Sequence, residues 1–343
     1  MEKLKAAMRR DMTLTILIGL TIAVLLFLAI GLGDKIFNGM SFQSMAFQLS
    51  EFAMLSLGMG LVMLLGGIDL GIVANANMSA MMGAFILSDM TLRESLGDGP
   101  VIVIAIVVSL LVATAAGVIN GILIAKVSVN PIIATLGTMT LYNGIAMAAS
   151  GGNGVSGFPQ DFTLMGTATM AGIPLLFIVF IVIAVVIIFI MGRTGFGRKI
   201  YMIGENHTAA RFSAVNNEKS IIIIYAMAGF CAGVAGLMIG ARVNSVKCGY
   251  GDTYLLQAIL VAVLAGISPS GGKGKVVGIL LALVCIQMLQ SSFTIWQFTP
   301  YSKKMIWGLM LLLLLFINML IDYLDVKKQK KLLQMQYEQS KKK

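Results

Sequence analysis

Residues 175–192 read LLFIVFIVIAVVIIFIMG, a run of 18 residues without a charged side chain. A helix needs about 20 mostly apolar residues to cross the hydrocarbon core of a bilayer. Comparable runs follow one another from Met12 to Asp322, and 58% of the chain is hydrophobic while only 12% is charged. Because a soluble domain carries about 25% charged residues, the composition excludes that class and predicts a polytopic membrane protein.

The spacing of these runs predicts an all-α domain of ten transmembrane helices within residues 1–343. The second and third runs nearly touch at Gly66-Gly67-Ile68-Asp69, so nine or eleven helices remain alternatives. The predicted N-terminal segment is 1–11, the helical region is 12–322 with a central loop at 193–219, and the basic tail is 323–343. The ten predicted spans are 12–33, 43–66, 71–89, 100–125, 131–149, 172–192, 220–241, 254–267, 276–296 and 304–322.

Charge indicates the orientation of these spans. With ten spans and a cytoplasmic N-terminus, 19 of the 25 Lys and Arg residues fall on the cytoplasmic side. Such a bias is the positive-inside pattern, and it predicts that both termini are cytoplasmic. The first span is interpreted as an uncleaved helix, because its apolar run is too long for a typical signal peptide. The net charge of +10 is therefore attributed to topology and attraction to membrane lipid rather than to nucleic-acid binding.

Several kinds of chemistry lack the residues that they need. His207 is the only histidine and the three cysteines have no metal-ligand spacing, so the chain offers no His-based metal site or Ser-His-Asp triad. The run Ser270-Gly271-Gly272-Lys273-Gly274-Lys275 lacks the spacing of a phosphate-binding loop. We therefore expect no catalytic residue and no bound cofactor or metal. Uphill transport would need an ion gradient or a separate ATPase.

Polar residues within the apolar runs are candidates for a solute pathway. Glu51 is the only ionisable residue clearly inside a predicted span, whereas neutral amides and hydroxyls are more frequent, which favours an uncharged, hydrogen-bonding solute. For any single one of these residues, packing between helices is the more common explanation, and Asn75 with Asn77, close after Gly66-Gly67, is the best exception. The candidate pathway residues are Glu51, Asp69, Asn75, Asn77, Asn120, Asn130, Thr135, Asn143 and Gln257.

Two glycine-containing segments look like weak repeats of each other. Leu65-Gly66-Gly67-Ile68-Asp69 and Leu264-Ala265-Gly266-Ile267-Ser268 both lie at predicted cytoplasmic helix ends. Interrupted spans in corresponding halves are typical of transporters with broken helices.

The central loop contains a short predicted helix. Asn206 is a plausible N-cap, and Thr208-Ala209-Ala210-Arg211-Phe212 are residues that form helices well. This helix could simply close the loop, or it could dock a cytoplasmic motor.

Four collinear segments resemble a known family, the permease subunits of ribose-type, carbohydrate-uptake ATP-binding-cassette importers. The most specific is residues 197–213, GRKIYMIGENHTAARFS. The others are residues 53–70, with Gly66-Gly67-Ile68-Asp69-Leu70, residues 130–139, NPIIATLGTM, and Ala265-Gly266 with residues 270–274. The resemblance extends from about residue 45 to 320.

The resemblance implies a vitamin-B12-permease-like fold in a bacterial cytoplasmic membrane. It also implies partners: a second permease subunit, identical or different, an extracellular or periplasmic solute-binding protein, and a two-cassette cytoplasmic ATPase that uses the ATP. In this family the central loop holds the coupling helix, with Ala209 and Ala210 expected on its docking face. The implied coupling residues are Gly204, Glu205, Asn206, Thr208, Ala209, Ala210, Arg211 and Ser213.

Departures from the family pattern leave the solute open. Gly71-Ile72-Val73 replaces the usual Ser-Val-Gly, and Leu255 and Gln257 stand where acidic residues are common. Ribose is therefore not assigned. Another sugar, a polyol, autoinducer-2 and a role as one half of a heterodimeric permease all fit. Nucleosides and branched-chain amino acids are alternative solutes, and an ion-coupled secondary carrier is the remote alternative class.

Overall fold

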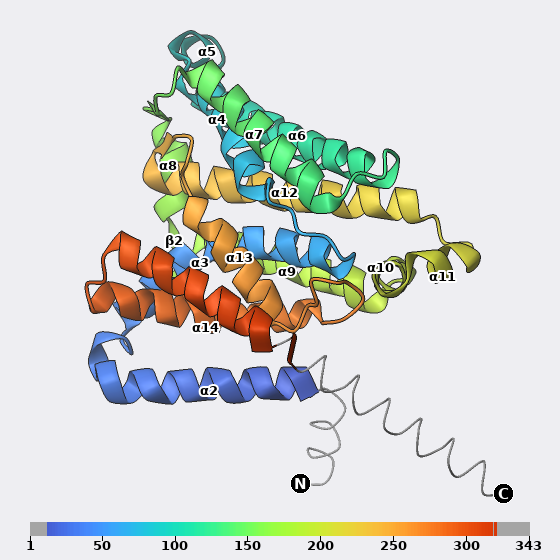
Figure 1. Ribbon diagram of the computed structural model, residues 1–343. Helices are drawn as coiled ribbons and strands as arrows, with labels where there is room; N and C mark the ends of the chain where they lie inside the picture. Colours follow the sequence, from blue (N-terminus) through green and yellow to red (C-terminus); the bar gives the residue numbers. More distant parts are fainter. Residues whose placement is uncertain (1–11, 318, 321–343) are drawn as a thin grey trace, which may run out of the picture. The chain divides into compact units, whose positions relative to one another are not determined.

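The computed structural model describes residues 12–317, 319 and 320, and the described chain is mostly helical (Figure 1). Residues up to Phe298 form one compact unit, and residues from Thr299 form a second, whose described part is the helix Pro300–Ile317. The predicted segments 1–11 and 323–343 lie outside the described residues.

Helices supply nearly all the elements of the first unit, and four two-residue strands lie in its loops. The strands, which were not predicted, pair as β1 with β4 and β2 with β3, both antiparallel. The helices are α2 (Met12–Leu32), α3 (Gly39–Leu64), α4 (Ile72–Ser88), α5 (Met90–Leu96), α6 (Asp98–Ala125), α7 (Pro131–Ser150), α8 (Gln160–Thr167), α9 (Leu175–Arg193), α10 (Gly195–Glu205), α11 (His207–Phe212), α12 (Asn217–Val243), α13 (Asp252–Leu264) and α14 (Val276–Ile295), with a 3-10 turn η1 (Gly33–Lys35); the strands are β1 (Val155–Ser156), β2 (Thr169–Met170), β3 (Ile173–Pro174) and β4 (Ser245–Val246).

Most of the predicted spans correspond to long apolar helices. Seven helices in the described chain are long and apolar enough to cross a membrane: α3, α6, α7, α9, α12, α14 and Pro300–Ile317. The predicted spans 12–33, 71–89 and 254–267 coincide with shorter apolar helices, namely Leu17–Leu32 within α2, α4 and α13. The structure therefore supports a multi-pass membrane protein, and the count of ten crossings stays a prediction.

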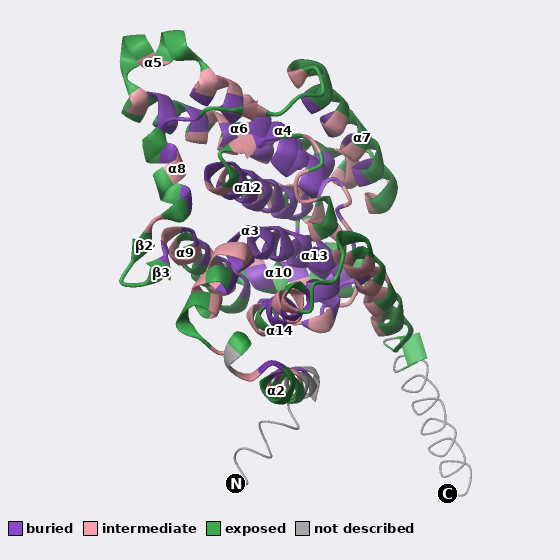
Figure 2. Cartoon of the chain, turned by 90° about the vertical axis from the view of Figure 1, so that its left-hand side faces the viewer, coloured by how far each residue is buried: buried purple, intermediate pink, exposed green. Residues whose placement is uncertain are grey.

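Burial separates inner helices from outer ones. In the most apolar window of α3, 89% of the residues are buried, compared with 67% in α12 and 28% in both α7 and α9 (Figure 2). The exposed side chains of α7 and α9 are nonetheless apolar, such as Leu136, Ile145, Val182 and Phe189. An apolar surface that would be costly in water is suited to lipid or to another membrane helix.

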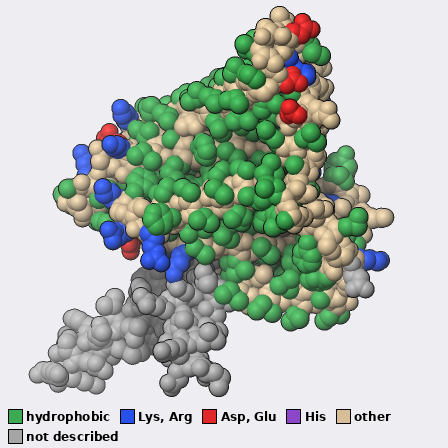
Figure 3. Space-filling model, turned by 180° about the vertical axis from the view of Figure 1, so that it is seen from behind, with side chains coloured by type: hydrophobic (Ala, Val, Ile, Leu, Met, Phe, Trp, Pro, Cys, Tyr) green, Lys and Arg blue, Asp and Glu red, His purple; other side chains and the backbone are tan. Residues whose placement is uncertain are grey.

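The space-filling view shows how charged and hydrophobic side chains are distributed over one face of the molecule (Figure 3). Most Lys and Arg side chains in this view gather at the end where α10 and α11 lie, with a few acidic ones among them. A second charged group, mainly acidic, lies near α5, and a broad hydrophobic surface separates the two (Figure 3). This distribution is what the positive-inside pattern predicts for a membrane-embedded chain.

Glycines allow α6 and α12 to approach closely. A Cβ atom on Gly117 would overlap the backbone carbonyl oxygen of Tyr225, and one on Gly229 would overlap the carbonyl oxygen of Ala113. Small residues at such crossings bring helix backbones into van der Waals contact, which is a main source of association in lipid.

The two weak sequence repeats adopt the same backbone turn. After α3, the Gly66 amide donates to the Met63 carbonyl (3.0 Å) and the Gly67 amide to the Val62 carbonyl (3.4 Å). After α13, the Gly266 amide donates to Val263 (3.0 Å) and the Ile267 amide to Ala262 (3.0 Å). Gly66 and Gly266 have φ values of +85° and +79°. Both helices therefore end in a Schellman motif, in which glycine adopts the left-handed conformation.

The α6–α12 crossing yields a prediction about stability. Gly117→Leu should destabilise the protein by about 1–3 kcal/mol or more, because the added side chain meets backbone atoms that cannot rotate away. Gly19→Leu in α2 is the control, since no atom lies within 4 Å of its added Cβ. Thermal unfolding in detergent, followed by size-exclusion chromatography, measures the difference. Equal melting temperatures would show that the helices do not cross at this glycine.

Candidate functional site

The central loop folds into two helices rather than the single one predicted. Asn206 caps α11 as expected, because its side-chain oxygen accepts hydrogen bonds from the amides of Thr208 and Ala209, both at 3.0 Å. The additional helix is α10, which begins after Thr194. It was missed because its three glycines and adjacent charges disguise the buried positions Gly197, Ile200, Ile203 and Gly204, which recur at helical spacing.

The end of α10 meets the turn after α3 and the loop between α13 and α14. A Cβ on Gly204 would overlap the Leu64 carbonyl oxygen and would lie 2.5 Å from the Gly272 amide nitrogen. That amide donates to the Leu64 carbonyl at 3.0 Å. The joint of α10 with residues 64–66 and 270–272, called the glycine joint below, therefore brings three backbone segments together where side chains do not fit.

Tyr201 adds a side-chain contact between α10 and α14. Burial raises the pKa of its phenol, and a hydrogen bond with the Val276 backbone opposes this shift. Val276 is the first residue of α14. Movement of α10 would therefore act directly on the start of that helix.

The residues of α11 differ in exposure from what was expected. Ala209 is exposed, but Ala210 is only 1% exposed, so its expected place on a docking face is wrong. Ala210 faces inward because adjacent residues of a helix point in directions about 100° apart. Phe212 is 88% exposed at the end of α11. The sequence of α11, HTAARF, did not indicate which side of the helix would be exposed.

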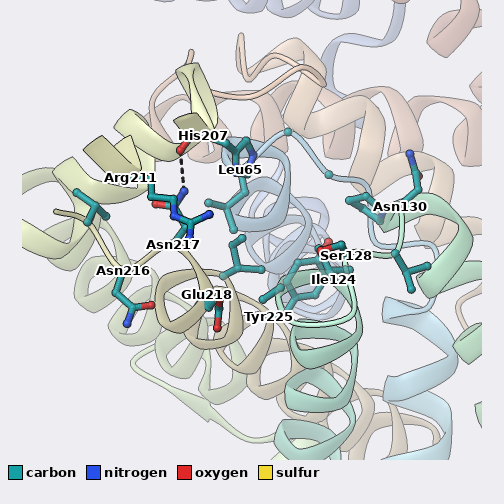
Figure 4. A pocket seen from close by; sticks show the side chains of 17 residues that line it. Leu65, Ile124, Ser128, Asn130, His207, Arg211, Asn216, Asn217, Glu218 and Tyr225 are labelled. Atoms are coloured by element: carbon teal, nitrogen blue, oxygen red, sulfur yellow. Dashed lines mark hydrogen bonds between the residues drawn. The ribbon is translucent and has the colours of Figure 1, made fainter. Parts of the chain in front are cut away.

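A cavity of about 680 Å³ lies behind α11. Its walls come from the turn after α3, the loop between α6 and α7, α11, and the first two turns of α12 (Figure 4). The Asn217 side-chain amide donates to the His207 carbonyl at 2.8 Å, which ties α12 to α11 across this cavity.

Glu51, the one charged residue predicted within a span, is fully buried and paired. Arg242 binds it with two hydrogen bonds, one of them 2.9 Å from Nη2 to Oε2, and the Tyr254 hydroxyl donates to Oε2 at 3.2 Å. These partners lie on α12 and α13, about 200 residues away in sequence. The pair neutralises the carboxylate and joins three helices, which sequence spacing could not reveal.

Asp69 and Thr135 organise the turn between α3 and α4. The Asp69 carboxylate accepts a hydrogen bond from the Gly71 amide at 2.9 Å. The Thr135 hydroxyl accepts from the Leu70 amide at 3.1 Å and lies 3.1 Å from the Ile68 carbonyl. Asn130 caps α7 by accepting from the Ile132 amide at 3.0 Å. These contacts attach α7 to the turn and account locally for all three polar residues.

Asn75 and Asn77 lie on different faces of α4, because residues two apart in a helix do not face each other. The Asn75 amide donates to the Ala113 carbonyl of α6 at 3.0 Å. The Asn77 amide nitrogen is buried without a hydrogen-bond partner, as are the side-chain oxygens of Asn75 and of Asn120 on α6. A buried polar atom without a partner costs about 1–3 kcal/mol, so these three amides are suited to a solute or to water.

The remaining candidates lie elsewhere. Gln257 of α13 donates a hydrogen bond to Gln290 of α14 at 2.9 Å. Helix α13 also carries Tyr254, which binds Glu51. Asn143 of α7 is only half-buried. The predicted pathway residues therefore form two groups, one around α4, α6 and α7 and one around α3, α12, α13 and α14.

Comparison with known proteins places the chain among transport permeases. Residues 41–315 match the model of a family described as branched-chain amino acid transport system / permease component. No solved structure matches the chain.

Curated relatives cover most of the sequence. The ribose import permease protein RbsC of Haemophilus influenzae is 32% identical over 82% of this chain and 84% of the relative. The autoinducer 2 import system permease protein LsrD of Yersinia enterocolitica is 31% identical over 79% of this chain and 82% of its own length. The D-allose transport system permease protein AlsC of Escherichia coli is 29% identical over 80% and 82%. The chain is thus similar to import permeases that are named for sugars and for autoinducer 2. Because the family model spans well over half of the residues, the chain belongs to the family of branched-chain amino acid transport system permease components.

Proposed function

We propose that this chain is the permease subunit of an ATP-driven importer that carries a small uncharged polar solute, most consistent with a sugar, across a bacterial cytoplasmic membrane. The relatives named for ribose, autoinducer 2 and D-allose support the solute class. Two such chains, identical or different, form the pathway with ten helices each in a vitamin-B12-permease-like fold. A solute-binding protein delivers the solute on the outer side.

The glycine joint is the single observation that carries this proposal. A cytoplasmic ATPase would act on α11, and α10 transmits its movement through Gly204 to the end of α3 and to the loop between α13 and α14. Tight backbone contacts transmit displacement well because close-packed segments cannot deform gradually. In this reading Gly204, Glu205, Asn206, Thr208, Ala209, Arg211 and Ser213 serve coupling, whereas Ala210 supports α11 from inside.

The buried groups favour a neutral solute. Glu51 is neutralised by Arg242, and the orphaned atoms of Asn77 and Asn120 belong to amides. An amide offers a donor and an acceptor to hydroxyl groups without a charge. A nucleoside remains the second candidate, since it presents the same kinds of groups.

Purification of the chain from its native membrane tests the proposal. A two-cassette ATPase should accompany it in mild detergent, and mass spectrometry should identify that protein together with one or two permease chains. Uptake should survive collapse of the proton gradient. A chain that purifies alone and carries out gradient-dependent uptake would instead be an ion-coupled carrier.

Exposed residues of α11 should matter for coupling. Ala209→Glu and Phe212→Ala should each reduce solute-stimulated ATP hydrolysis at least about fivefold, because changing a residue that matters at an interface costs more than about 1 kcal/mol. Phe42→Ala is the matched control, since Phe42 is also exposed (50%) but lies on α3 at the opposite end from α11. Hydrolysis by the purified complex is the measurement. Unchanged coupling in both variants would refute docking at α11.

The two asparagines of α4 should behave differently. Asn77→Leu should slow transport about tenfold without lowering thermal stability, because it removes an amide whose nitrogen has no protein partner. Asn75→Leu should lower stability by about 1 kcal/mol, since it breaks the bond to Ala113. Uptake in vesicles and melting in detergent separate the two effects. If Asn77→Leu transports normally, Asn77 is a packing residue.

Glu51 should act as half of an ion pair rather than as a proton carrier. Glu51→Gln should destabilise the protein by up to about 3 kcal/mol, because Arg242 loses its partner. The double variant Glu51→Met/Arg242→Met should recover much of that loss, as expected for contacting residues. Melting temperatures of the single and double variants test this. Additive losses would mean that the two side chains do not interact.

A further inference from the structure

The cavity behind α11 contains a buried hydroxyl that has no hydrogen-bond partner. Tyr225 of α12 is 1% exposed, and its side-chain oxygen is among the unpartnered buried atoms of the described chain. This oxygen lies against Gly67 and would be 2.9 Å from a Cβ added there. Gly67, Pro131 and Tyr225 all line the cavity (Figure 4). A residue of the cavity wall therefore carries a buried hydroxyl that lacks a partner within the described chain.

A second buried atom points to the same space. The Asn217 side-chain oxygen also lacks a partner, although its amide nitrogen is held by the His207 carbonyl. Two lining residues thus carry an unpartnered buried oxygen, one a hydroxyl that can donate or accept and one an amide oxygen that accepts. A volume of about 680 Å³ is within the range of small-molecule sites, roughly 300–1,000 Å³.

The charges of the lining favour a neutral ligand. Arg211 and Glu218 contribute opposite charges, and Ser128, Asn130 and Asn216 contribute hydroxyl and amide groups. An anion would meet the Glu218 carboxylate, and a cation would meet the Arg211 guanidinium. A molecule with several hydroxyl groups can donate to and accept from all of these side chains.

The residues that line the cavity also connect α11, the proposed coupling helix, to α4 and α7, which carry candidate pathway residues. Leu65 and Gly67 precede α4, Asn130 caps α7, and His207 begins α11. A molecule in the cavity would contact all three, and its binding would favour one arrangement of α11 relative to α4 and α7.

We propose that this cavity is a binding site for a small, neutral, polyhydroxylated molecule on the cytoplasmic side of the protein. Of the candidate pathway residues, Asn130 alone is among the residues that line it. The assignment of side rests on the proposed function, and the ligand class rests on the Tyr225 and Asn217 oxygens and on the balanced charges around them. If imported solute binds in this cavity, its concentration in the cytoplasm would affect the coupling between the ATPase and the permease.

Protection from chemical labelling tests this site in the complete transporter. Ser128→Cys places a thiol in the lining, and a membrane-impermeant maleimide should label it in inverted membrane vesicles. Millimolar D-ribose should slow this labelling at least threefold. Adding Tyr225→Phe, which removes only the unpartnered oxygen, should weaken the protection about threefold to tenfold, as expected for one neutral hydrogen bond.

Two controls make the result specific. Ser213→Cys lies at the end of α11 outside the cavity lining, so D-ribose should not protect it. Tyr142→Phe removes a buried hydroxyl that is bonded to the Ala116 carbonyl at 2.9 Å, and protection should persist in this background.

Several outcomes would overturn the site. Labelling that D-ribose does not slow, or slows equally in the Tyr225→Phe background, would mean that only water fills the cavity. Protection by inorganic phosphate but not by D-ribose would indicate an anion site instead. Labelling of Ser128→Cys only in right-side-out vesicles would contradict the proposed orientation while leaving ligand protection measurable, so the two failures are distinguishable.

Discussion

Every backbone amide and carbonyl group that enters the hydrocarbon core must find a partner within the protein, because lipid offers none. This constraint explains why the long elements of the described chain are helices and why the interruptions are few. It also explains how they are built. The turns after α3 and α13 close their last carbonyl groups with Schellman hydrogen bonds, and the Leu64 carbonyl accepts an additional bond from Gly272. At both turns another backbone segment covers the irregular backbone, Ser270 at Gly66 and Gly274 at Gly266.

The same constraint governs polar side chains. Glu51 is accompanied by Arg242 and Tyr254, Gln257 by Gln290, and Thr135 by the turn at residues 68–70. Against this background of paired groups, the unpartnered atoms of Asn77, Asn120 and Tyr225 stand out. They divide between the interior near α4 and α6 and the cavity behind α11, so a solute crossing the protein would meet hydrogen-bonding groups in both regions.

Much of the architecture followed from one-dimensional patterns. Apolar runs predicted the positions of the helices, and the Asn206 cap was confirmed because a capping side chain acts within three residues. The repeat around Gly66 and Gly266 had a structural meaning for the same reason, since a helix C-cap is a local motif. The predictions were wrong where the outcome depends on which side chains become buried. Ala210 was placed on an exposed face, and α10 was overlooked because its amphipathic pattern is short and interrupted by glycine.

The sequence by itself determined the class of protein, the approximate helix positions and the family, because these depend on composition, periodicity and collinear motifs. Only the tertiary structure decided which side chains meet. The partners of Glu51 lie about 200 residues away, and the glycine joint combines residues 64–66, 204 and 270–272. Such contacts depend on how helices cross, and helix crossings are set by the packing of whole surfaces rather than by the spacing of residues along one segment.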